Sequence, residues 1–117
     1  MSLLDKALLH VTFNYGAYAY AGWVESAPEE MLRELDRITI RLASLNPERL
    51  AAMEQRVYEC AQALWESTRE REHQLQKVGP NAFAAQLTVL TRDVLVHNPE
   101  GAAMAAAALT TLRRALP

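Results

Sequence analysis

Residues 26–50 read SAPEEMLRELDRITIRLASLNPERL and contain two helix starts with one apolar stripe between them. Ser26 and Glu29 form a capping box, in which the serine hydroxyl accepts a hydrogen bond from the first helical turn. Asn46-Pro47-Glu48 supplies an N-cap, a proline at the first helical position and an acid in the first turn. The apolar residues in between are spaced four, three, four and three apart: Met31, Leu35, Ile38, Leu42 and Leu45. This spacing predicts an amphipathic helix after Ser26 and a second helix from residue 47.

The rest of the chain repeats this chemistry. Val78-Gly79-Pro80 predicts a helix stop, Asn81 is the cap expected for the next helix, and Asn98-Pro99-Glu100 repeats the start seen at 46–48. Two further stripes follow helical spacing: Leu50, Met53, Val57, Cys60 and Leu64, and then Phe83, Leu87, Leu90 and Val94. The last predicted helix, about 99–115, is rich in alanine, which permits close helix approach. We predict an all-α fold, a single domain over 1–117 that forms an antiparallel bundle of about five helices.

The first 25 residues carry two patterns. Residues 3–11 follow helical spacing, whereas Phe13-Asn-Tyr15 and Tyr18-Ala-Tyr20 alternate as strands do. An isolated hairpin in a chain without other strands would be poorly supported. We therefore predict a helix over 3–25, with a strand within 11–24 as the alternative.

The third predicted helix, which begins at residue 47, has a charged end that gives the clearest indication of a contact surface. Its apolar stripe lapses after Leu64, and residues 66–77 contain one large aliphatic side chain, Leu75, with no breaker before Gly79. A continuous helix over 47–78 would be roughly 48 Å long and would overhang the bundle. Such an overhang needs something to contact, such as a partner or a second copy of the chain. The alternatives are that this stretch frays or breaks into two helices.

Composition limits the classes of partner and compartment. The net charge is -2, from 12 Lys and Arg against 14 Asp and Glu spread along the chain, which disfavours a nucleic-acid binder. Cys60 is the only cysteine, so no intramolecular disulfide can form. The start of the chain lacks the features of a signal peptide, and residues 7–24 contain too many polar side chains for a membrane span. We expect a cytoplasmic protein that binds neither nucleic acid nor membrane.

The sequence contains no convincing set of catalytic or metal-binding residues. Glu70 and His73 share one helix face, as in carboxylate-bridged dimetal sites, but neither His10 nor His97 has the second such glutamate three residues earlier. Cys60 falls on an apolar stripe, where a cysteine is usually an inert core residue. We predict no catalytic, cofactor-binding or metal-binding residues and no cofactor.

A row of arginines in the second predicted helix has two interpretations. Arg33, Arg37 and Arg41 follow one another at four-residue spacing and could bind an acidic partner or phosphates. Glu30 and Glu34 lie three residues before the first two arginines, so local ion pairs on a solvated face are the favoured interpretation.

The functional hypothesis is a non-enzymatic protein-binding module. Its specific form is an immunity protein, an antitoxin-like inhibitor that neutralises a toxin or effector by direct binding, because small, mildly acidic helical proteins often serve in this way. The charged extension of the third helix is the predicted contact surface. The residues predicted to bind the partner are Trp65, Glu66, Arg69, Glu70, Arg71 and His73.

Other function classes stay open. A small-ligand-binding or enzymatic bundle could use a pocket lined by aromatic and histidine side chains of the first helix: Tyr15, Tyr18, Trp23 and His10. The aromatic residues of that helix also suit an interface, which motivates a structural homo-oligomer, with a homodimer as its simplest form. A secretion chaperone or an adaptor is the remaining alternative.

Overall fold

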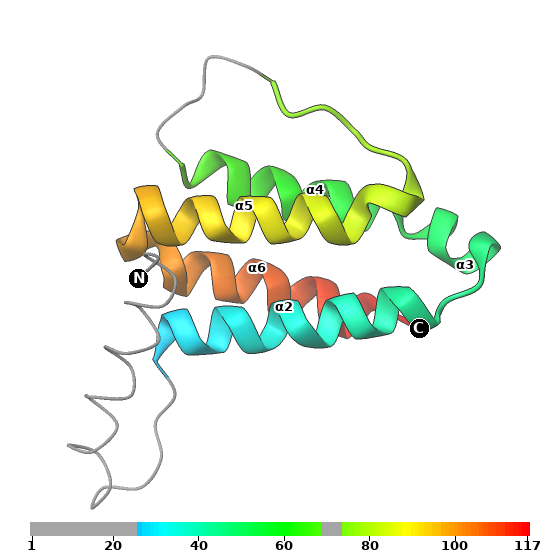
Figure 1. Ribbon diagram of the computed structural model, residues 1–117, viewed down its shortest axis with the longest axis horizontal. Helices are drawn as coiled ribbons and strands as arrows, with labels where there is room; N and C mark the ends of the chain where they lie inside the picture. Colours follow the sequence, from blue (N-terminus) through cyan, green and yellow to red (C-terminus); the bar gives the residue numbers. More distant parts are fainter. Residues whose placement is uncertain (1–25, 69–73) are drawn as a thin grey trace, which may run out of the picture.

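The computed structural model describes residues 26–68 and 74–117, and every regular element in these ranges is helical (Figure 1). The elements are α2 (Ala27–Ser44), α3 (Pro47–Ala52), α4 (Glu54–Glu66), η1 (Pro80–Ala82), α5 (Phe83–His97), η2 (Pro99–Gly101) and α6 (Ala102–Ala115), where η denotes a 3₁₀ turn. The all-α fold class is thus confirmed. The helix predicted over 3–25, with its alternative strand, lies outside the described residues.

The four longer helices form a ring in which α2 and α4 each contact both α5 and α6. Figure 1 shows that α2 and α6 run in one direction, and that α4 and α5 run in the opposite direction. The antiparallel arrangement predicted from the sequence therefore holds for α2 with α5 and for α4 with α6. It is wrong for the neighbouring pairs α2–α6 and α4–α5, which are parallel.

The predicted stripes supply most of the core. All four longer helices contribute to one cluster of buried apolar side chains. Its largest fully buried members are Phe83, Met31, Ile38, Leu64, Leu87, Leu109, Val57 and Val94. Burial of each such side chain stabilises the fold by roughly 1.5–3 kcal/mol. The 3-4 spacing thus identifies the inner faces of α2, α4 and α5 correctly.

The predicted helix starts divide into two groups. Ser26 Oγ accepts from the Glu29 backbone N–H at 3.3 Å, and Asn46 Oδ1 accepts from the Arg49 backbone N–H at 2.8 Å. Both caps are confirmed. Asn81 instead lies within η1, and Asn98 makes no cap hydrogen bond with its side chain. These last two positions begin with a 3₁₀ turn before the α-helix, so their cap predictions are wrong.

The prediction of a continuous third helix over 47–78 is also wrong. A turn at Met53 separates α3 from α4, α4 ends at Glu66, and residues 74–79 are not helical. Two hydroxyl side chains explain the end of α4: Ser67 Oγ donates to the Leu64 carbonyl at 2.7 Å, and Thr68 Oγ1 donates to the Trp65 carbonyl at 2.8 Å. Such local bonds compete with helix continuation, and no apolar stripe remains to favour it.

Residues 74–79 run back along the bundle instead of extending beyond it, and we call this segment the crossover (Figure 1). Tyr58 on α4 donates from its hydroxyl to the Leu75 carbonyl at 3.3 Å, and Lys77 Nζ lies 5.0 Å from the centroid of the Tyr58 ring. Leu75 and Val78 pack partly buried against the core. Because the crossover returns the chain to the end where α4 began, α5 runs parallel to α4.

Candidate functional site

The predicted partner surface is only partly within the described residues. Trp65 is half-buried against the core, and Glu66 is exposed and accepts from Gln62 Nε2 at 3.1 Å. The remaining members, Arg69, Glu70, Arg71 and His73, lie outside the described residues, as does the alternative pocket of Tyr15, Tyr18, Trp23 and His10. The structure therefore positions two of the predicted contacts, both in the last turn of α4.

The connection between α5 and α6 contacts the end of α4. Asn98 Nδ2 donates to the Ser67 carbonyl at 2.6 Å and so joins the end of α4 to the α5–α6 connection. A Cβ atom on Gly101 would lie 2.7 Å from Asn98 Nδ2, which is closer than real side chains allow, so this position requires glycine unless Asn98 moves. This hydrogen bond fixes the position of the backbone directly after Trp65 and Glu66.

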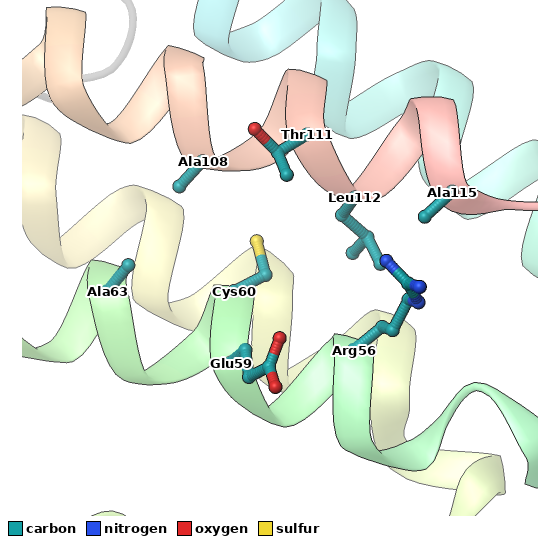
Figure 2. A pocket seen from close by; sticks show the side chains of 8 residues that line it. All are labelled: Arg56, Glu59, Cys60, Ala63, Ala108, Thr111, Leu112 and Ala115. Atoms are coloured by element: carbon teal, nitrogen blue, oxygen red, sulfur yellow. The ribbon is translucent and has the colours of Figure 1, made fainter.

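A small hollow lies between α4 and α6, and we call it the α4–α6 cleft (Figure 2). Its volume is about 210 Å³, below the range of most small-molecule sites. The sulfur of Cys60 points from α4 toward α6, while Arg56, Glu59 and Thr111 are exposed. The lining residues are Arg56, Glu59, Cys60, Ala63, Ala108, Thr111, Leu112 and Ala115.

Cys60 is the one thiol in this cleft, and its burial disfavours the reactive form. It is 5% exposed, and burial raises the pKa of its thiol to about 12. The thiol is therefore protonated at neutral pH, whereas a reactive cysteine needs the thiolate. The prediction of a core cysteine is confirmed.

A larger hollow lies between the last turns of α2, the short helix α3 and the start of α5, and we call it the bundle-end groove. Its volume is about 510 Å³. Most of its lining is apolar, and the Asn81 amide in that lining is exposed and makes no hydrogen bond to the part of the chain that the structure describes. The lining residues are Thr39, Leu42, Ala43, Leu45, Pro47, Leu50, Pro80, Asn81, Phe83 and Ala84.

The arginine row of α2 makes interactions within the chain. Arg33 Nη2 lies 4.0 Å from Glu29, and Arg37 Nη1 lies 3.7 Å from Glu34. Arg41 donates to the backbone carbonyl of Pro117. The favoured interpretation, local pairing, is confirmed for Arg37 with Glu34, and the row is not an unpartnered basic surface.

One buried ion pair was not predicted. Glu34 is 5% exposed and accepts from Arg113 Nε, so the pair joins α2 to α6. The sequence holds one signal for it, because Glu34 lies three residues after Met31 and four before Ile38 and thus falls on the apolar face. Its partner lies 79 residues away and could not be inferred from spacing.

Metal-binding and membrane-spanning features are absent from residues 26–68 and 74–117. These ranges contain no cluster of three or more His, Cys, Asp and Glu side chains able to hold a metal ion. None of their helices has the length and apolar character needed to cross a bilayer. Neither a family model, nor a curated protein, nor a solved structure matches this chain.

Proposed function

We propose that this chain is a non-enzymatic protein-binding module that receives apolar side chains of a protein partner in the bundle-end groove. The observation that supports it is the composition of that groove. Leu42, Leu50 and Phe83 come from three different helices and meet there, with Asn81 in the same lining. Protein interfaces commonly combine an apolar centre with a polar rim whose groups form hydrogen bonds to the partner.

The partner in this proposal is a toxin or effector, and the chain is its immunity protein. The support is a general likeness to such inhibitors, which are often small, mildly acidic and helical; in this chain an open apolar groove adds a place to bind. The α4–α6 cleft supports a small-ligand or enzymatic function less well, because its volume is small and its buried thiol is protonated at neutral pH. The proposal includes a cytoplasmic location, which suits a buried free thiol at Cys60.

The proposal can be tested with two adjacent substitutions at the end of α2. Ala43 is exposed and lines the groove, whereas Ser44 is exposed and does not line it. The full-length tagged protein and its Ala43→Arg and Ser44→Arg variants would serve as bait in native-cell extracts at two salt concentrations. Mass spectrometry would then give the identity and stoichiometry of captured proteins.

The expected result is one stoichiometric protein partner, a toxin or effector, whose capture fails with Ala43→Arg and persists with Ser44→Arg. A long arginine side chain would fill the groove at residue 43 and exclude the partner's apolar side chains. Equal capture by both variants would show that the groove is not the contact surface. Absence of any partner with well-folded bait would contradict the protein-binding function itself.

A further inference from the structure

The exposed face of α6 beside the α4–α6 cleft is unusually poor in charge. Between Glu100 and Arg113 the chain has no ionisable side chain. The exposed residues there are Ala103, Met104, Ala107 and Thr111, and Met104 is 77% exposed. A helix face that meets only water usually carries charged residues. This face continues into the cleft, whose walls include the small side chains of Ala63 and Ala108.

Two opposite charges border the same cleft on α4. Arg56 and Glu59 are both exposed, and they lie three residues apart. Arg56 makes no ion pair or hydrogen bond through its side chain within the described part of the chain. Glu59 accepts a hydrogen bond from Gln55 Nε2 at 3.3 Å. These two charges complement each other under a two-fold rotation, because an antiparallel copy would place its Glu59 opposite Arg56 and its Arg56 opposite Glu59.

We propose that the α4–α6 face is the interface of a homodimer, in which two copies of α4 pack antiparallel about a two-fold axis between Arg56 and Glu59. The small side chain of Ala115, at the same end of the cleft as Arg56, allows the partner's α4 to approach closely (Figure 2). Opposite charges fix the register, since a shifted or parallel copy would not pair them. A second copy is the occupant because it supplies both complementary charges.

This inference extends beyond the proposed function. The homodimer interface and the bundle-end groove have no lining residue in common. The two proposals therefore assign different residues to the two contacts. The two proposals can fail independently, because one concerns self-association of the purified chain and the other concerns capture of a different protein.

Charge exchange tests the proposal. The full-length protein and three variants, Arg56→Glu, Glu59→Arg and the double variant, would be compared by light scattering and analytical ultracentrifugation over a wide concentration range. Each single variant places like charges opposite each other, so its dimer dissociation constant should rise at least about tenfold. The double variant restores opposite charges and should recover the dimer. Arg92→Glu, at an exposed position on α5, is the control and should dimerise as the wild type does.

Each outcome decides for or against the interface. Loss in both single variants with recovery in the double variant would establish it. A wild-type chain that remains monomeric at all concentrations would overturn it. A dimer that both single variants leave unchanged, or that the double variant fails to restore, would place the contact on another face. Circular dichroism would confirm that each variant retains its helices.

Discussion

At the scale of single residues, the position of Cys60 on its helix decides its chemistry. Its sulfur points toward α6 and is almost fully covered, and desolvation is the cause of its raised pKa. Burial penalises the charged thiolate and leaves the neutral thiol unaffected. Cys60 consequently behaves as a packing residue in the α4–α6 cleft, although it is accompanied there by exposed charged groups.

This shift predicts a specific pH dependence. The thiol pKa of about 12 in the folded protein lies above its ordinary value of 9.0. Alkylation of the folded protein should therefore be slow near neutral pH and should keep accelerating above pH 9, where an ordinary cysteine levels off. The unfolded chain loses this proton at lower pH than the folded chain does, so the free energy of unfolding should fall from about pH 9 toward pH 12.

Two controls isolate the effect of Cys60. The Cys60→Ala variant should lose less stability than the wild type over the same alkaline range, as measured by urea unfolding. The urea-unfolded wild type should alkylate as an ordinary cysteine. A folded-state alkylation rate that levels off near pH 9 would show that the thiol is not desolvated.

At the scale of helices, two asparagines with the same sequence context have different roles. Asn46 and Asn98 both precede Pro-Glu, and both were predicted to be N-caps from that pattern. Asn46 caps α3, whereas Asn98 donates to the Ser67 carbonyl at the end of α4. Local sequence identifies a helix start, but it cannot identify a partner 31 residues away. The end of α4 depends on the hydroxyl groups of Ser67 and Thr68, whose bonds to the preceding turn leave no trace in the spacing of apolar residues.

Serine substitution should separate these two roles. Serine caps helices about as well as asparagine, so Asn46→Ser should change the free energy of unfolding by less than about 0.5 kcal/mol. The shorter serine side chain at position 98 loses the bond to Ser67, so Asn98→Ser should cost about 1–2 kcal/mol. Urea unfolding of both variants measures the difference. Equal effects would mean that the bond from Asn98 to Ser67 adds no stability.

At the scale of the whole molecule, chain topology brings together surfaces that no local pattern could predict. The stripes identify the inner faces of α2, α4 and α5 but not the order of helices around the ring. The bundle-end groove needs Leu42 beside Phe83, and the α4–α6 cleft needs Ala63 beside Ala108. Both depend on the crossover, which makes α4 and α5 parallel and leaves α6 beside α2.

The pair of Glu34 and Arg113 tests this arrangement, because it joins the parallel helices α2 and α6. Arg113→Met would leave the buried Glu34 with Arg37 at 3.7 Å as its remaining ion-pair neighbour among the described residues. The expected cost is about 1–3 kcal/mol in the free energy of unfolding. Arg114→Met, at the exposed neighbouring position, should stay within about 0.5 kcal/mol of the wild type. Thermal and urea unfolding measure both, and similar values for the two variants would mean that the pair contributes no stability.

The parallel pairing of α2 with α6 also has a consequence for synthesis on the ribosome. The first two long helices, α2 and α4, are not neighbours in the ring, so they cannot form a stable hairpin with each other as they emerge. α2 meets α5 only after the crossover has been made, and it meets its most extensive neighbour only when α6 appears. Contacts between distant segments slow folding. The apolar surfaces of α2 and α4 that α6 covers in the folded protein therefore stay exposed until α6 packs, and exposed apolar surface of this kind is what chaperones bind.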